Sequence, residues 1–255
     1  MFFLETLLVL GLVVIGGVGL LTWRKIRAVH LATYKLLSDV AAIRTESENF
    51  FSQVQALLAL ERRLQLDMAL PAMRGWAGSP DFLLHVAEQI HQRRPAVIVE
   101  CSSGVSTIVA ARCLQQLGAG HVWSLEHEEQ YAQKTRDMLV RYGLSDWATV
   151  LHAPLQTTHT STPWYQEDVL PINIGQIDML VVDGPPAGLA PMVRAPAFPR
   201  LRSRLAPNCI VLVDDADRPD ETEMVRQWAA TEPGLVIERP TAEKGLAMAI
   251  LSTKS

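Results

Sequence analysis

The chain has 255 residues, 49% of them hydrophobic and 20% charged, so we expect one sizeable α/β domain with an extension and exclude wholesale disorder. The formal net charge of −4 gives no support for a nucleic-acid partner. Three cysteines without metal-like spacing (Cys101, Cys113 and Cys209) are expected to be buried, reduced thiols, which argues against a disulfide scaffold.

The first predicted element is an apolar N-terminal helix. Thr6 to Trp23 carry no charge, and a helix of that length reaches most of the way across a hydrocarbon core of about 30 Å. A signal peptide is the alternative, but Glu5 is the only early charge and no small-residue cleavage site follows. Cations within residues 24–27 are typical of a cytoplasmic flank. We therefore expect membrane contact through residues 2–23 and a single-pass membrane protein whose remaining chain is cytoplasmic.

Residues 28–68 are predicted to continue as a helix. Apolar residues recur at alternating steps of three and four, and they are Leu36, Val40, Ile43, Phe50, Val54, Leu57 and Leu64. One interpretation is a coiled coil that pairs two chains as a homodimer. The other is a stalk helix that packs this stripe on its own domain, and polar interruptions at Ser47 and Glu61 slightly favour it. We divide the chain into an anchor with its flank (1–27), a helical stalk (28–75) and an α/β domain (76–255).

From residue 76 onward, apolar strands alternate with amphipathic helices. A helix is expected from Pro80 to about His91, after an N-cap signal at Ser79. The predicted strands are Ala96–Cys101, His121–Glu126, Ala148–His152, Ile177–Asp183, Cys209–Asp214, Leu235–Glu238 and Leu246–Leu251, the last two close enough to form a hairpin. This alternation predicts a Rossmann-like, doubly wound, seven-stranded sheet, mostly parallel, with a C-terminal antiparallel hairpin strand, preceded by a transmembrane helix and a stalk helix.

Acidic residues lie at the carboxyl ends of four of the predicted strands, at Glu100, Glu126, Asp183 and Asp214–Asp215. In open α/β sheets, ligands bind outside the carboxyl ends of the strands, where the strand order reverses. Carboxylates gathered on one rim repel one another unless a ligand, a metal or hydrogen bonds compensate. The tight turn after Glu100 also leads into a helix N-terminus, whose free N–H groups favour anionic groups. The sequence therefore predicts a ligand site at this edge, with Glu100 and Glu126 as the two halves of a nucleoside-binding site.

Four segments together resemble the class I S-adenosylmethionine-dependent methyltransferases. They are Glu100-Cys-Ser-Ser-Gly-Val-Ser-Thr107, Ser124-Leu-Glu-His127, Val181-Val-Asp-Gly-Pro-Pro186 and Val213-Asp-Asp-Ala-Asp-Arg218. The branch with a Glu-x-Gly-x-Gly-x-Ser-Thr turn and an Asp-Gly-Pro-Pro turn is the most similar. The resemblance extends from about residue 76 to the end of the chain. It implies a methyltransferase that uses S-adenosylmethionine. Together with the predicted anchor, it leads us to expect a membrane-anchored enzyme that acts on a small molecule, a lipid or a glycan precursor.

The resemblance implies which residues hold the methionine part of this cofactor. Glu100 and the backbone of Ser102, Ser103 and Gly104 would face it, and Gly104 would allow a close approach. Ser106, at the start of the following helix, would bind the cofactor carboxylate or cap the helix. Ser102 departs from the family, which usually has glycine there. If that position requires a positive φ, the serine is strained.

The resemblance also assigns the nucleoside half of the site. Glu126 would accept hydrogen bonds from both ribose hydroxyls, because a carboxylate has two acceptor oxygens at a suitable separation. His127 and the turn that contains Ala153 would border the adenine.

Asp183 and Asp214 are the candidate catalytic residues that the resemblance implies. Asp183 would take the proton that the acceptor loses, or orient a group that does. In metal-dependent O-methyltransferases, two acids and an amide in these regions hold Mg²⁺. Asp183, Asp214 and Asp215 form an all-oxygen set here. We do not favour the metal, because no matching asparagine follows Asp214.

Two other functions remain open at this stage. A nicotinamide-dependent oxidoreductase also places an acid about 20 residues after a glycine-rich turn, but its fingerprint has three glycines where this turn has one. A catalytically degenerate methyltransferase fold that serves as an interaction module is the other alternative. The arginines of residues 194–204 are expected on the solvated face of a helix, or else to clamp an acidic substrate or an anionic headgroup near the membrane.

Overall fold

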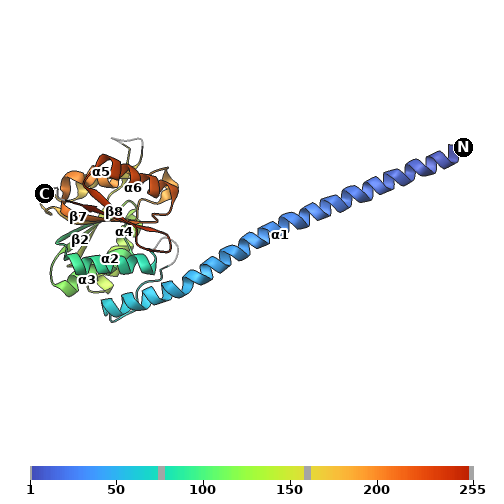
Figure 1. Ribbon diagram of the computed structural model, residues 1–255. Coiled ribbons are helices and arrows are strands. Elements are labelled where there is room, and N and C mark those ends of the chain that lie inside the picture. Colours follow the sequence, from blue (N-terminus) through green and yellow to red (C-terminus); the bar gives the residue numbers. More distant parts are fainter. Residues whose placement is uncertain (1, 74–77, 158–161, 253–255) are drawn as a thin grey trace. The chain divides into compact units, whose positions relative to one another are not determined.

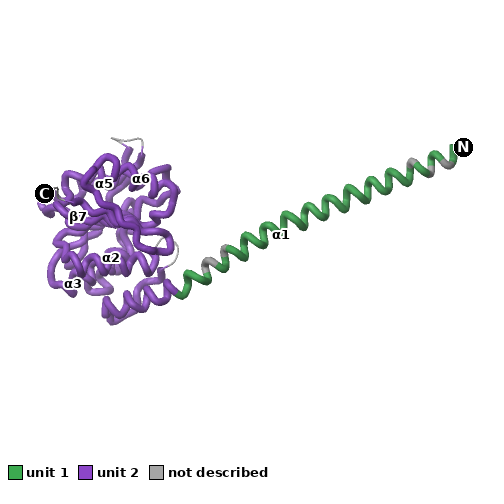
Figure 2. The backbone as a smooth tube through the Cα atoms, viewed as in Figure 1, with its two compact units in different colours: residues 1–51 green, residues 52–255 purple. Residues whose placement is uncertain are grey.

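The computed structural model describes residues 2–73, 78–157 and 162–252 (Figure 1). The chain forms two compact units, Met1–Phe51 and Ser52–Ser255 (Figure 2). The predicted boundary between stalk and α/β domain, at residues 75 and 76, lies outside the described residues and stays a prediction.

A single helix, α1 (Phe2–Leu64), covers both predicted helical segments. In the first unit, the described apolar side chains of α1 are exposed, including Leu36, Val40 and Ile43. In the second unit, by contrast, Leu60 and Leu64 are fully buried in a core cluster of the α/β domain. The end of α1 therefore packs on the α/β domain, but Leu64 is the one residue of the predicted stripe that is fully buried, so the choice between a stalk helix and a coiled coil stays open. A homodimer through residues 28–68 stays a prediction.

The membrane prediction is wrong for the part of the chain that the structure describes. No helix there is sufficiently long and apolar to cross a bilayer. A span needs about 20 consecutive, mostly apolar residues. The uncharged run Thr6–Trp23 is shorter than that, and cations at Arg24, Lys25 and Arg27 follow it. The single-pass anchor through residues 2–23, and the cytoplasmic placement derived from it, are corrected accordingly.

The α/β domain contains a seven-stranded sheet in the order β3-β2-β1-β6-β7-β9-β8. Its strands are β1 (Val97–Cys101), β2 (His121–Glu126), β3 (Ala148–His152), β6 (Ile177–Val182), β7 (Leu205–Asp214), β8 (Leu235–Glu238) and β9 (Leu246–Leu251). The first five strands of that order pair in parallel, and β9 is antiparallel to both β7 and β8. The predicted mostly parallel sheet with an antiparallel C-terminal strand is confirmed.

Helices cover both faces of this sheet. The helices are α2 (Pro80–Arg93), α3 (Val105–Leu117), α4 (Glu129–Arg141), α5 (Ala197–Leu201) and α6 (Pro219–Thr231). One buried cluster joins α2, α3 and α4 to one face, and a second cluster joins α5 and α6 to the other (Figure 1). All five residues of β1 are buried, as expected for a central parallel strand covered on both sides.

The strand order places a ligand site between β1 and β6. Going along the chain, β2 and β3 add on one side of β1, whereas β6 and β7 add on the other. The order therefore reverses at the β1–β6 pair, and the loops that follow these two strands diverge at their carboxyl ends. A short antiparallel pair, β4 (Leu155–Gln156) and β5 (Trp164–Tyr165), lies in the segment after β3.

Candidate active site

The turn between β1 and α3 adopts two backbone conformations that favour glycine. Ser102 has φ 143° and Gly104 has φ 148°. A side chain costs about 1 to 3 kcal/mol in such a conformation, so Ser102 is strained, as the sequence suggested. Its Oγ is buried and has no hydrogen-bond partner. Gly104 faces open space, because a Cβ added to it would meet no atom within 4 Å. The backbone beside Gly104 is therefore accessible to a ligand.

Glu100, at the end of β1, is held in place by two hydroxyl groups. Thr107 and Ser124 donate hydrogen bonds to its Oε2, over 2.6 and 2.7 Å. Burial raises the pKa of Glu100, and the nearby hydroxyl groups of Ser106, Thr107 and Ser124 partly offset the rise. Its second oxygen, Oε1, is buried with no partner. A buried carboxylate oxygen without a donor is costly, which indicates a place for a ligand N–H or ammonium group.

Glu126, at the end of β2, lies across the turn from Glu100. Its Oε2 accepts a hydrogen bond from Ser103 Oγ over 2.9 Å, and its Oε1 accepts one from the backbone N–H of Glu128 over 3.1 Å. His127 Nδ1 lies 3.0 Å from the same Oε1. Burial favours the neutral acid, but these hydrogen bonds outweigh it and lower the pKa of Glu126. Glu126 is therefore an ionised acceptor at neutral pH.

The segment after β3 reaches the same edge. The backbone N–H of Ala153 donates to the carbonyl of Glu126 over 2.7 Å. His127 is mostly buried, and its contact with Glu126 raises its pKa. Its ring packs edge-on against Tyr165, with centroids 6.3 Å apart. Glu126, His127 and Ala153 therefore lie together, as the resemblance implied.

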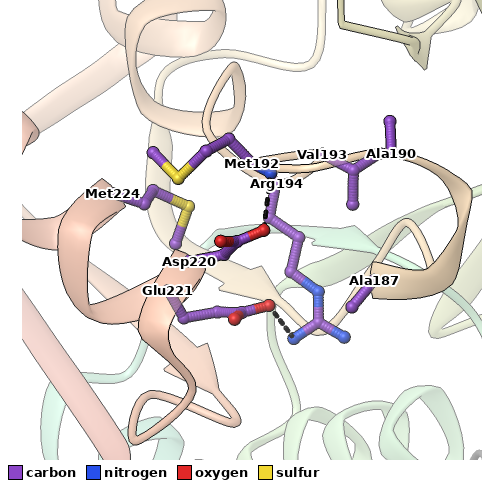
Figure 3. Close-up of a pocket in the computed structure, with 8 residues that line it drawn as sticks. All are labelled: Ala187, Ala190, Met192, Val193, Arg194, Asp220, Glu221 and Met224. Atoms are coloured by element: carbon purple, nitrogen blue, oxygen red, sulfur yellow. Dashed lines mark hydrogen bonds and ion pairs between the residues drawn. The ribbon is translucent and has the colours of Figure 1, made fainter.

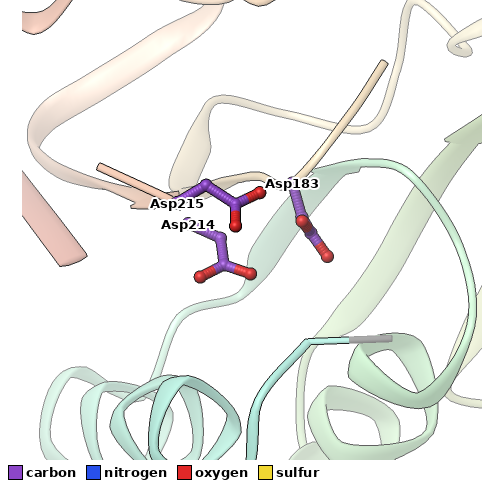
Figure 4. Close-up of side chains that lie close together, drawn as sticks. All are labelled: Asp183, Asp214 and Asp215. Carbon is purple, nitrogen blue, oxygen red and sulfur yellow. The ribbon is translucent and has the colours of Figure 1, made fainter. Parts of the chain in front are cut away.

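The three aspartates after β6 and β7 form a compact cluster (Figure 4). Asp183, Asp214 and Asp215 each offer an oxygen within 4.8 Å of the others. Burial, then the charge of Asp214, raises the pKa of Asp183 well above its ordinary value. Burial, then the charge of Asp215, raises the pKa of Asp214 to about 6. Both carboxyl groups therefore bind a proton more tightly than they would in water.

Arg194 has a place in the site that its local sequence does not predict. We expected it on a solvated helix face, but it precedes α5 and only 4% of its surface is exposed. It forms ion pairs with Asp183, Asp215 and Glu221. Figure 3 shows its guanidinium turned toward Glu221 of α6. No local pattern predicts this burial, because the three acids come from β6, β7 and α6.

Tyr165 is a second residue that sequence reasoning missed. It is buried, and burial raises the pKa of its phenol well above 10. A Cβ added to Gly184 would lie 2.5 Å from the Tyr165 hydroxyl oxygen and 3.3 Å from the Ser102 Cβ. Tyr165 therefore borders both the turn after β1 and the turn after β6. The aromatic pair Trp164-Tyr165 within a polar loop was the one available signal.

The predicted site residues thus meet at one edge of the sheet. The unpartnered Glu100 oxygen, the open space beside Gly104 and the ionised Glu126 fit a ligand with an amino group and a sugar. The aspartate cluster is less suited to Mg²⁺. Its oxygens are of the kind that Mg²⁺ binds, but Asp215 Oδ2 already accepts a hydrogen bond from Arg194, over 3.1 Å, and forms an ion pair with Arg218 at 2.7 Å.

Comparisons with known proteins agree with this geometry. A family model described as a methyltransferase domain matches residues 99–216, from β1 to just beyond β7. No curated protein matches the sequence. Among solved structures, the O-methyltransferase TomG from Streptomyces achromogenes, in complex with S-adenosylmethionine, is 18% identical with a TM-score of 0.52, covering 79% of this chain and 89% of that one.

Two further structures show the same likeness. An O-methyltransferase from Bacillus cereus in complex with S-adenosylhomocysteine is 19% identical with a TM-score of 0.52, and covers 79% of this chain and 91% of that one. The Podospora anserina methyltransferase PaMTH1, bound to S-adenosylhomocysteine, is 16% identical with a TM-score of 0.53, at 78% and 88% coverage. The chain has the fold of the class I S-adenosylmethionine-dependent methyltransferases.

Proposed function

We propose that this protein is an S-adenosylmethionine-dependent methyltransferase that methylates a hydroxyl group of a small molecule. One observation carries the proposal: Glu100 and Glu126 lie at the ends of adjacent strands, on either side of an open glycine turn at the switch in strand order. Glu100 has an unpartnered oxygen for an ammonium group, and Glu126 is an ionised acceptor for hydroxyl groups. The methyltransferase family match and the fold support the same assignment.

The cofactor would be held along this edge. Glu100 Oε1 would accept from its amino group, next to the backbone of Ser102, Ser103 and Gly104. Glu126 would accept from the ribose hydroxyls, for which its two oxygens retain lone pairs beside their existing bonds. Ser106 lies buried in the first turn of α3, where free N–H groups favour a carboxylate. His127 and Ala153 would border the adenine.

Bound in this way, the cofactor supplies a methyl group activated by an adjacent sulfonium, and the protein supplies position and a proton acceptor. Asp183 would accept the proton of the acceptor hydroxyl, since its raised pKa makes it a stronger base than an exposed aspartate. Asp214, whose pKa is about 6, would share this proton across the cluster. The O-methyltransferases among the structural neighbours support oxygen as the acceptor atom. The sequence has no excess of basic residues, which favours a small-molecule acceptor over a nucleic acid.

Calorimetry on the full chain tests the proposal. The chain is titrated separately with S-adenosylmethionine, S-adenosylhomocysteine and NAD. We expect heat with the first two ligands and none with NAD. Heat with NAD alone would instead favour an oxidoreductase. Absence of heat with all three ligands would contradict the proposal and favour an interaction module, for which the strained Ser102 is the supporting observation.

A further inference from the structure

Arg194 is buried at the active-site edge. Among the cations that the structure describes there, it forms the most hydrogen bonds and ion pairs. Its Nε donates to the carbonyl of Pro185 over 3.2 Å. Its Nη1 donates to the carbonyl of Asp214 over 3.2 Å and to the carboxylate of Asp215 over 3.1 Å. Its Nη2 donates to the carbonyl of Asp183 over 2.8 Å and lies 3.6 Å from that residue's carboxylate. One guanidinium therefore fixes the loops after β6 and β7 to each other.

The same guanidinium is surrounded by acids. Asp183, Asp214, Asp215 and Glu221 are all buried or nearly so. Two of their oxygens, Asp214 Oδ1 and Glu221 Oε2, are buried without a partner. Arg218 is the second guanidinium that contacts the cluster, and it reaches Asp215 from a half-exposed position. Several buried carboxylates in one place are unfavourable without a compensating cation.

We propose that Arg194 is the resident cation of this cluster and takes the place that a divalent metal holds in an all-carboxylate site. A guanidinium differs from a metal ion here because it is part of the chain and its planar fork donates directional hydrogen bonds to carbonyl and carboxylate oxygens together. Arg194 thereby positions Asp183 through both its main chain and its side chain, and excludes Mg²⁺ or Mn²⁺ from the three aspartates. Only the consequence for methyl transfer rests on the proposed function, because metal exclusion is a property of the folded chain.

Mn²⁺ titration of the full chain tests this proposal without a methyl acceptor. We expect no specific Mn²⁺ binding by the wild-type chain up to about 1 mM, although three carboxylates lie within reach of one ion. Arg194→Met removes the charge and retains a similar apolar length. This variant should bind Mn²⁺ at least about tenfold more tightly than the wild type, since a positive charge a few ångströms away is lost. Adding Asp214→Asn to Arg194→Met should abolish the gained binding.

Two further variants keep the test decisive. Arg194→Lys preserves the charge, so it should stay unable to bind Mn²⁺. Arg218→Met removes the outer cation that contacts Asp215 and leaves Arg194, so it should not gain a metal site either. If Arg194→Met is too unstable to purify, the charge-compensated pair Arg194→Met, Glu221→Gln removes one buried acid with the cation and retains all three aspartates.

Clear results would overturn the proposal. Specific Mn²⁺ binding by the wild-type chain that Asp214→Asn removes would show that Arg194 does not exclude the metal. Folded Arg194→Met, or the compensated pair, with no gain in Mn²⁺ binding would show that the guanidinium does not occupy a metal position. A failure of methyl transfer alone, with the predicted Mn²⁺ results, would contradict the proposed function and leave the role of Arg194 intact.

Discussion

Ser103 Oγ donates a hydrogen bond to Glu126 Oε2 over 2.9 Å, which ties the turn after β1 to the end of β2. The same Oγ lies 3.0 Å from Thr135 Oγ1 of α4. Three elements that are separate in the sequence therefore orient one carboxylate. The two halves of the candidate cofactor site are rigidly connected before any ligand is bound.

The neighbouring residue in this turn gives the first prediction. We expect Ser102→Gly to stabilise the chain by about 1 kcal/mol, because relief of backbone strain exceeds the entropy cost of a glycine. No hydrogen bond is lost, since Ser102 Oγ has no partner. Chemical denaturation measures the change in the free energy of unfolding.

Ser103→Ala is the matched control for that prediction. It removes the hydroxyl that donates to Glu126, so it should destabilise the chain by about 1 kcal/mol. A loss of stability in Ser102→Gly comparable to that in Ser103→Ala would show that the positive φ of Ser102 is not a source of strain.

The second prediction concerns the contact between Gly184 and Tyr165. Gly184→Ala should destabilise the chain by about 1 to 3 kcal/mol, because the new Cβ would lie 2.5 Å from the Tyr165 hydroxyl oxygen and 3.0 Å from the Cys101 carbonyl. In a Tyr165→Phe background, the same substitution should cost less, since the nearest atom is gone. Thermal unfolding of the four chains gives the coupling between the two positions.

Gly188→Ala is the control, because a Cβ there meets nothing within 4 Å. An equal cost of Gly184→Ala with tyrosine or phenylalanine at position 165 would mean that the hydroxyl does not restrict the turn after β6.

The third prediction is a pH dependence of stability at Asp214. Burial, then Asp215, raises its folded-state pKa from 3.8 to about 6. Protonated Asp214 is therefore favoured in the folded chain, and its stabilising contribution is lost as the pH rises from 4 through 6. Asp214→Asn mimics the protonated form at every pH. Its melting temperature should match the wild type near pH 4 and exceed it at pH 8.

Glu223→Gln provides a contrast of opposite sign. Hydrogen bonds from Arg226, then from Gln227, lower the pKa of the exposed Glu223 to about 2. Its contribution is present at neutral pH and small, so this variant should not gain stability as the pH rises. If the advantage of Asp214→Asn over the wild type did not grow between pH 4 and pH 8, Asp214 would not titrate as a buried acid.

Local sequence patterns predicted the sheet because its strands are nearly continuous apolar runs. His121–Glu126 and Ala148–His152 begin and end where expected. β7 begins at Leu205 instead of Cys209, and so includes Pro207 and Asn208. A proline argues against a strand in sequence-based reasoning. The structure accommodates it with an irregular register against β6, which no local pattern reveals.

The candidate site was predictable only where its residues follow strands directly. Glu100, Glu126 and Asp183 follow apolar runs, so strand alternation brings them to one edge. Arg194 lies in a turn, and its burial depends on acids that β6, β7 and α6 bring together in space. Tyr165 reaches the site through a two-residue strand, too short to produce a period-two pattern.

The N-terminal helix shows a second limit of prediction from the sequence. Its existence was predictable from composition, and α1 is continuous from Phe2 to Leu64. The membrane assignment depended instead on the full length of one apolar run, and no described helix meets that requirement.

The affinity of the full chain for S-adenosylmethionine, measured by calorimetry for Glu126→Ala beside the wild type, tests the central claim most directly. Glu129→Ala is the control, since Glu129 is exposed and contacts Arg136 and His152. Glu126→Ala removes the acceptor of the ribose hydroxyls. A hydrogen bond to a charged group contributes about 1.5 to 3 kcal/mol, so binding in this variant should weaken about tenfold or more. Glu129→Ala should bind as the wild type does. Equal affinities in the wild type and Glu126→Ala would contradict the account.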